Sequence, residues 1–172
     1  MMSRPAPGRM PGGLRATLLR ASVAGLLVLP AACGAPPPPP VPPTVAQLTL
    51  STTADANPTD AGQGAPLVLR VYQLSSPAAF EKAEFYRLYN QDTATLGADL
   101  IKKDEYLLAP GTSRTITLNP AEPVRAIGVF GGYRAFQKAT WRGTADIPPH
   151  KTTAVTVTAG AAGITVTAKP AP

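Results

Sequence analysis

Cys33 is the only cysteine of the 172-residue chain, and its neighbours limit what its thiol could do. The stretch Leu27 to Pro40 (LVLPAACGAPPPPP) places it between an apolar run and an unbroken row of prolines. A disulfide within the chain needs a second cysteine, and a buried core thiol is not expected between two such segments. The thiol therefore either reacts with another molecule or is itself modified.

The segment before Cys33 has the pattern of an export signal. Ala21 to Leu29 is apolar but too short to span a bilayer as a helix, and Ala31 and Ala32 are small residues at a cleavage point. A cysteine directly after such a site resembles the lipobox of bacterial lipoproteins, whose thiol is acylated. We interpret residues 1–32 as a lipoprotein signal peptide and Cys33 as the lipidation site. Gly34 after the cysteine implies, by the enterobacterial sorting rule, transport to the outer membrane.

Candidate catalytic and metal-binding residues are few. His150 is the only histidine and has no cysteine companion for a metal site. The nucleophile motif G-x-S-x-G does not occur, and capping or turns explain the serines. We therefore predict no catalytic site, no metal, no cofactor and no small-molecule substrate.

The positive charge of the chain is concentrated in the signal segment. From Cys33 onward twelve Lys and Arg face ten Asp and Glu, because four arginines and no acidic residue come earlier: Arg4, Arg9, Arg15 and Arg20. The basicity thus belongs to the signal and predicts no nucleic-acid partner.

A proline tract follows the cysteine, and after it come segments with the alternating pattern of β-strands. Pro36 to Pro43 favours polyproline II, which makes a semi-rigid spacer of about 25 Å, so residues 33–45 are expected to be the lipidated cysteine and a stalk. Short segments in which apolar and polar residues alternate then predict a two-sheet antiparallel β-sandwich over residues 46–168. A tail is expected at 169–172. The predicted strands include Ala46–Thr53, Pro66–Leu74, a strand from about Ala98, Arg114–Leu118, Ala126–Phe130, Ala154–Thr158 and Ile164–Thr167.

One helical insertion and one long loop interrupt these strands. Ala78 to Tyr89 contains good helix formers and no glycine, which predicts a helix. Ala54 to Ala65 is long for a hairpin connection and has no apolar periodicity. Composition alone favours a solvated loop here, but Asx and Thr side chains and a proline at residues 55–60 can also order it.

The order of several motifs resembles the TssJ family, the outer-membrane lipoproteins of bacterial type VI secretion systems. The motifs are VLRVYQL at Val68 to Leu74, the Leu108 to Gly111 turn, and IGVFGGYR at Ile127 to Arg134 leading to Trp141. The resemblance implies a transthyretin-like sandwich and no enzymatic activity. It also implies a partner, the periplasmic C-terminal domain of the inner-membrane protein TssM, bound by the loop between the first two strands.

On that basis we expect the partner-binding residues to be Asp55, Ala56, Asn57, Pro58, Thr59 and Asp60. The two aspartates would steer docking, and Asn57 with Pro58 would form the tip of the loop. The alternative is a periplasmic lipoprotein that binds a small ligand or a cell-wall fragment.

We predict that Cys33→Ser abolishes recovery of the protein with the outer membrane and leaves the domain folded, because the thiol lies outside the predicted core. Membrane fractionation and circular dichroism test this. Normal membrane recovery of the variant would contradict the lipoprotein interpretation.

Overall fold

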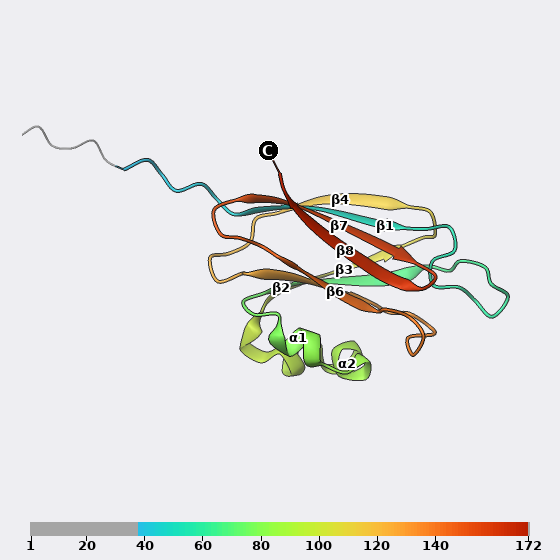
Figure 1. Ribbon diagram of the computed structural model, residues 1–172. Helices are drawn as coiled ribbons and strands as arrows, with labels where there is room; N and C mark the ends of the chain where they lie inside the picture. The colour runs from blue at the N-terminus through green and yellow to red at the C-terminus, as the bar shows by residue number, and fades with distance from the viewer. Residues whose placement is uncertain (1–37, 172) are drawn as a thin grey trace, which may run out of the picture. The chain divides into compact units, whose positions relative to one another are not determined.

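The computed structural model describes residues 38–171 (Figure 1). The predicted signal peptide, Cys33 and the first prolines of the spacer lie outside the described residues. The described chain forms two four-stranded sheets with strand orders β4-β1-β7-β8 and β3-β2-β5-β6. The strands are β1 (Val45–Thr52), β2 (Leu67–Leu74), β3 (Leu100–Leu108), β4 (Ser113–Leu118), β5 (Ala126–Gly131), β6 (Arg142–Asp146), β7 (Thr152–Gly160) and β8 (Gly163–Pro170).

The predicted β-sandwich is confirmed, and its core lies between the two sheets. Alternate residues of β1 are buried, and Leu48 and Leu50 meet residues of β2 such as Leu69 and Val71 in one apolar cluster. The pairs of strands are antiparallel except β1 and β7, which run parallel. The expected terminal hairpin is formed by β7 and β8, with Gly160 opposite Gly163.

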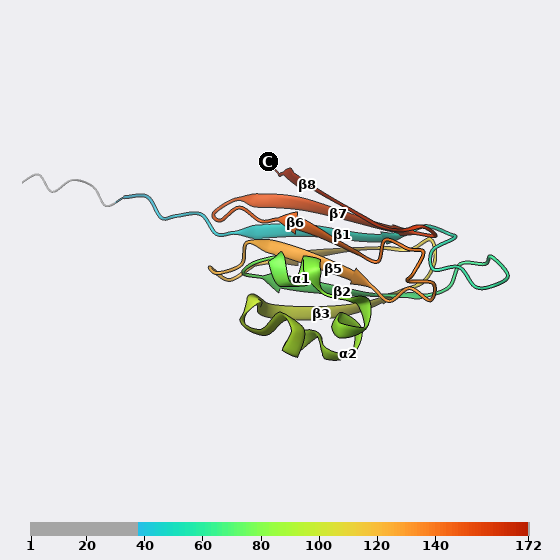
Figure 2. The ribbon, with the colours of Figure 1, turned by 60° about the horizontal axis from the view of Figure 1, so that its bottom comes forward.

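Two helices cover the outer face of the sheet that contains β2 and β5, as Figures 1 and 2 both show. They are α1 (Ala78–Lys82) and α2 (Phe85–Leu96), followed by a short 3₁₀ turn, η1 (Gly97–Asp99). A second apolar cluster fills the space beneath them and includes Tyr72, Phe80, Phe85, Leu88 and Phe130, with half-buried Trp141 against it. The ring of Trp141 lies edge-on to Phe85 and Phe130, with centroid distances of 5.3 and 5.6 Å.

The single helix predicted over Ala78 to Tyr89 is instead two helices. The chain is extended at Ala83 (φ −66°, ψ 145°), which ends α1. Arg142 of β6 stabilises this break, because its Nη1 donates to the carbonyl of Phe80 at 3.0 Å and to that of Ala83. Capping the last carbonyls of a helix with a cation is favourable.

A second interruption lies inside α2, where Gln91 has non-helical angles (φ −142°, ψ 37°). Arg70 of β2 donates to the carbonyls of Leu88 and Tyr89 at 3.2 and 2.9 Å, just before the kink. Just after it, Asp92 Oδ1 accepts the N–H of Thr93 at 2.8 Å. An arginine and an aspartate thus satisfy the backbone groups that the kink leaves free.

Asp92 is buried and also accepts hydrogen bonds through Oδ2 from the Tyr72 hydroxyl at 3.0 Å and from Lys103 Nζ at 2.9 Å. Burial by itself would raise the pKa of this carboxyl, but hydrogen bonds from Lys103, Tyr72 and the Thr93 N–H outweigh burial and lower that pKa.

The connections between strands gather at two ends of the sandwich. The end that we call the loop end carries connections 53–66, 109–112, 132–141 and 161–162. The other, the spacer end, carries 119–125 and 147–151 and receives residues 38–44. β1 runs from the spacer end to the loop end, and its eight residues span about 26 Å.

We predict that Asp92→Asn lowers the free energy of unfolding by about 2 kcal/mol at pH 7 because it removes charge-assisted hydrogen bonds. Since the pKa of Asp92 is lowered in the folded state, its contribution is present above the unfolded value of about 3.9 and is lost as the pH falls below it. Urea unfolding at pH 7 and pH 3 tests this, with exposed Asp60→Asn as the control. A deficit of equal size at both pH values would contradict the assignment.

Candidate partner-binding loop

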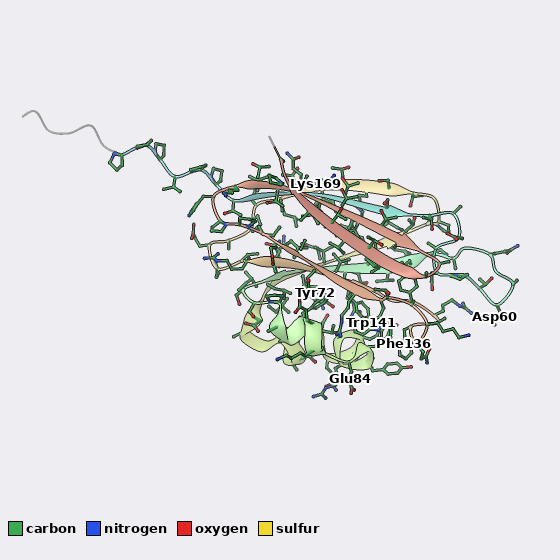
Figure 3. All side chains as sticks on the ribbon, viewed as in Figure 1. Asp60, Tyr72, Glu84, Phe136, Trp141 and Lys169 are labelled. Atoms are coloured by element: carbon green, nitrogen blue, oxygen red, sulfur yellow. The ribbon has the colours of Figure 1, made fainter. Side chains whose placement is uncertain are left out.

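The connection between β1 and β2, residues 53–66, projects beyond the loop end of the sandwich (Figure 1). Figure 3 shows Asp60 in this projecting part of the chain, at the same end of the domain as Phe136. Because β1 connects the two ends, the loop lies opposite the point where residues 38–44 enter the domain.

The projecting loop has its own backbone hydrogen bonds. At its base, Ala56 N–H donates to Thr53 O at 3.1 Å and Ala65 N–H donates to Ala56 O at 2.9 Å. Farther out, Thr59 accepts from Gly62 N–H and donates to Gln63 O, both at 2.8 Å. The loop is therefore a pair of closed turns, so a partner would meet a shape that is already formed.

Asn57 holds this loop to the rest of the loop end. Its side chain is 4% exposed, and its backbone is left-handed (φ 48°), which asparagine tolerates better than most residues. Its Nδ2 donates to Pro66 O at 2.9 Å, and its Oδ1 accepts the N–H of Arg134 at 2.9 Å. One amide thus closes the loop on itself and joins it to the connection between β5 and β6.

The base of the loop also contacts the β3–β4 turn. Gly111 N–H donates to Thr53 O at 3.1 Å, and the Thr52 hydroxyl donates to Ala109 O at 2.6 Å. A Cβ at Gly64 would lie 2.1 Å from Ala54 O, so only glycine fits this close approach. The loop is braced on two sides by neighbouring connections.

The structure places the six predicted binding residues in three environments. Asp55 and Asp60 are exposed, Pro58 and Thr59 are half-buried, and Ala56 and Asn57 are buried. The expectation that Asn57 forms the tip does not fit this burial, because its amide is used inside the domain. The exposed tip is formed by residues 60–63.

Sequence reasoning missed the partners of Asn57, which are the Pro66 carbonyl and the Arg134 N–H. The signal that could have indicated them is the Asn-Pro pair itself, since asparagine adopts the left-handed conformation and bonds nearby backbone. The glycine at Gly64 gave no signal beyond its turn-rich surroundings.

The two aspartates leave the loop negatively charged at its surface. The Thr53 hydroxyl donates to Asp55 Oδ1, which orients that carboxylate. Within the described residues, the ion pairs of the protein involve neither Asp55 nor Asp60. Both charges therefore remain available to an approaching cation.

Other residues with possible chemistry have structural roles. His150 lies in the connection between β6 and β7, where its N–H donates to Thr44 Oγ1 at 2.9 Å and its Nδ1 lies 3.1 Å from Pro42 O. It therefore fixes the chain that leads into β1. Among residues 38–171 no group of three His, Cys, Asp or Glu side chains is placed to hold a metal ion.

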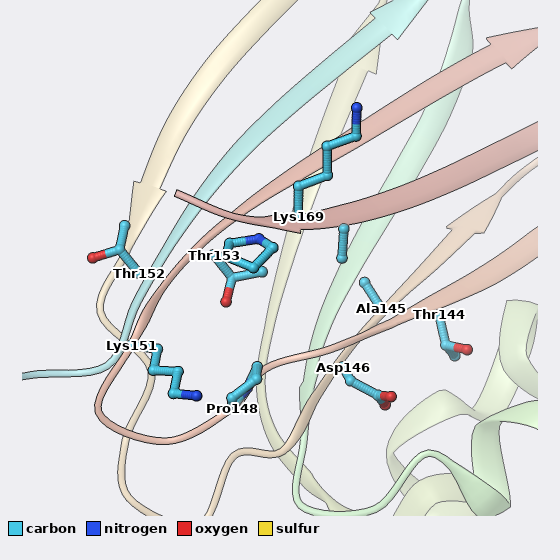
Figure 4. A pocket seen from close by; sticks show the side chains of 10 residues that line it. Thr144, Ala145, Asp146, Pro148, Lys151, Thr152, Thr153 and Lys169 are labelled. Carbon is cyan, nitrogen blue, oxygen red and sulfur yellow. The ribbon is translucent and has the colours of Figure 1, made fainter. Parts of the chain in front are cut away.

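A cavity of about 410 Å³ opens at the spacer end between β6 and the β7–β8 pair (Figure 4). Thr144, Asp146, Lys151 and Lys169 are among the residues that line it. Figure 4 shows the side chain of Lys169 extending away from Lys151 and Asp146, so the charged groups do not converge on one ligand position. Aromatic side chains do not line it either, and its geometry gives little support to the small-ligand alternative.

The helices in the described part of the chain are all too short or too polar to cross a membrane. This finding concerns residues 38–171 alone.

Comparison with known proteins identifies relatives over nearly the whole domain. Residues 44–162 match the family of type VI secretion lipoproteins that includes VasD, EvfM and TssJ. The crystal structure of the type VI secretion lipoprotein TssJ1 from Pseudomonas aeruginosa is 40% identical, covers 76% of this chain and 100% of its own, and superimposes with a TM-score of 0.73. No curated protein sequence matches the chain.

Two further solved structures share the fold. Serratia marcescens Lip, a membrane-bound component of the type VI secretion system, is 26% identical over 73% of this chain and 98% of its own, with a TM-score of 0.67. A structure described as the TssM C-terminal domain from EAEC contains a chain that is 22% identical over 74% of this chain and 99% of its own, with a TM-score of 0.57. At that identity the likeness shows the fold alone.

We predict that Asn57→Ala lowers the free energy of unfolding by about 2 kcal/mol, because two part-buried hydrogen bonds are lost and each contributes about 1 kcal/mol. Hydrogen exchange should also become faster at residues 54–66. Asp60→Ala is the matched control, since Asp60 lies in the same loop but is exposed. Unchanged exchange in Asn57→Ala would show that the loop is held by other contacts.

Proposed function

Because the chain belongs to the TssJ family of type VI secretion lipoproteins, we propose that it docks the periplasmic C-terminal domain of TssM through the loop 53–66. In this proposal Cys33 carries the acyl chains that anchor the protein in the outer membrane, and the folded domain lies in the periplasm. Docking an inner-membrane subunit onto the anchored domain would connect the two membranes and anchor the secretion complex.

The observation that carries the proposal is the position of the ordered loop. It projects from the end of the domain opposite residues 38–44, through which the chain leads back toward Cys33. Within the domain, the length of β1, about 26 Å, separates the loop from the point where the chain from the spacer enters β1. This position suits a contact with a protein that reaches across from the inner membrane.

Two chains with this fold support the choice of partner. One comes from a structure described as a type VI membrane complex and the other from one described as the TssM C-terminal domain, each 22% identical to this chain. These descriptions belong to the related structures, and they make TssM the first partner to test.

The structure of the loop suggests how docking would proceed. Asn57 and the backbone turns hold the loop in one shape, so binding would not have to order twelve or more flexible residues. The exposed carboxylates of Asp55 and Asp60 would attract a basic surface and orient it. In this proposal the protein acts by binding and has no catalytic role.

We predict that Asp55→Lys combined with Asp60→Lys weakens binding to the purified TssM periplasmic domain by at least tenfold, about 1.4 kcal/mol, because the steering charges are reversed. Binding of the full chain, purified from membranes in detergent, to the TssM domain is measured by biolayer interferometry. The affinity should fall mainly because association becomes slower, and the difference from the unaltered chain should be smaller at high salt.

The matched control reverses two charges at the spacer end, Glu122→Lys with Asp146→Lys, and should change the affinity less than twofold. Both residues are exposed and lie in or beside connections at that end. Equal losses in the two double variants would show a general charge effect, and no loss in the loop variant would place the interface elsewhere.

A further inference from the structure

We propose that an exposed apolar surface beside the loop is a second part of the same docking surface and takes an apolar face of TssM. The surface, called here the α2 patch, consists of Val68, Tyr86, Tyr89, Leu107, Gly132 and Phe136. This inference rests on the proposed function, since it assigns the same partner to both surfaces.

The α2 patch is assembled from four parts of the chain. Val68 of β2 and Leu107 of β3 are direct partners across the two strands. Gly132 N–H donates to Val68 O at 2.9 Å, and a Cβ placed on Gly132 would lie 3.9 Å from the Tyr89 ring. The patch is therefore continuous from β3 across β2 to α2.

Helix α2 contributes the aromatic part of the patch. The ring of Tyr86 lies edge-on to Phe136 at 5.0 Å, and Phe136 stacks on Phe85 at 4.1 Å. Tyr89 also stacks on Phe85, at 5.8 Å. The exposed rings thus rest on a buried ring and cannot turn inward without displacing it.

Three large apolar side chains of the patch are exposed. Leu107 is 71% exposed, Tyr86 60% and Tyr89 48%. These are three of the five large hydrophobic side chains that are exposed in the described part of the chain. A cluster of exposed apolar side chains marks an interaction site, whereas single exposed apolar side chains scattered over a surface do not.

The patch adjoins the loop through one connection. Residues 132–141 supply Gly132 and Phe136 to the patch, and the N–H of Arg134, between these two, donates to Asn57 Oδ1. Loop and patch therefore share one rigid connection at the loop end, and a partner on the loop would lie against the patch.

The size of a stable interface argues for the same conclusion. A standard interface buries about 800 Å² per partner and uses roughly 20 to 30 residues on each side. The loop 53–66 is shorter than that, and several of its residues are buried. The missing contact area has to come from adjoining surface, and the α2 patch supplies exposed tyrosines, a residue type that interface centres favour.

The test compares one double variant and one single-substitution control of the full chain in binding to the purified TssM periplasmic domain. Tyr86→Ser with Leu107→Ser should weaken the affinity by at least tenfold, mainly through faster dissociation. Ile101→Ser is the control, because Ile101 is exposed (38%) on the same strand but lies about 20 Å away toward the spacer end. It should change the affinity less than twofold.

The outcomes for the loop and the patch are distinguishable. If the loop charge reversals weaken binding and the patch variant does not, the patch proposal is overturned and the proposed function stands. If the unaltered chain does not bind the TssM domain, both are overturned. Loss of self-association by the patch variant in sedimentation velocity, with TssM binding unchanged, would assign the patch to a second copy and overturn the proposal.

A second measurement does not depend on how the variants fold. A photo-crosslinking amino acid replaces Leu107, and in a separate chain Ile101, and each is irradiated with the purified TssM domain. Crosslinks from position 107 and none from position 101 support the proposal. Crosslinks from 101 alone, or none from 107, overturn it.

Discussion

The buried side-chain amide of Asn57 is the contact on which the loop end depends. Its two hydrogen bonds, to Pro66 O and from the Arg134 N–H, join residues that lie 9 and 77 positions away in the sequence. Without them, the Pro66 carbonyl and the Arg134 N–H would lose these partners, and the loop could separate from the connection 132–141. This amide, together with the contacts between the loop base and the β3–β4 turn, therefore sets the relative position of the charged loop and the apolar α2 patch, which the proposed docking requires.

The helices on the outer face of the sheet are held by the same kind of contact. Arg70 and Arg142, both from strands, donate to carbonyls at the breaks before and within α2, and Asp92 satisfies an N–H beyond the kink. Each arginine also lies over an aromatic ring, Arg70 5.5 Å from Tyr89 and Arg142 4.5 Å from Trp141. The surface tyrosines are thus positioned by polar contacts from the sheet below them as well as by the apolar cluster.

The sequence predicted structural features that depend on neighbouring residues. It did not predict features that depend on contacts between residues far apart in the chain. Alternation and short apolar runs predicted the sandwich and all its strands except β6 (Arg142–Asp146), because one apolar face per strand requires a second sheet. These patterns could not predict the break at Ala83, since a residue with high helix propensity is extended there and the stabilising Arg142 lies 59 positions away. For the same reason the residue types at 55–60 indicated that the loop could be ordered, but not which of its side chains are buried.

The order of the strands fits a domain that is pulled between two attachments. With an anchor at Cys33 and a partner on the loop, force enters at one end of β1 and leaves at the other. β1 lies inside its sheet, between β4 and β7, and all eight of its residues are in register with β7. The covalent backbone of β1 would carry this tension from one end to the other, and the hydrogen bonds to β4 and β7 would hold the strand in place on both sides. A strand at the sheet edge, paired on one side, would lack half of this support, and we infer that a central β1 suits a protein that links a membrane anchor to a partner.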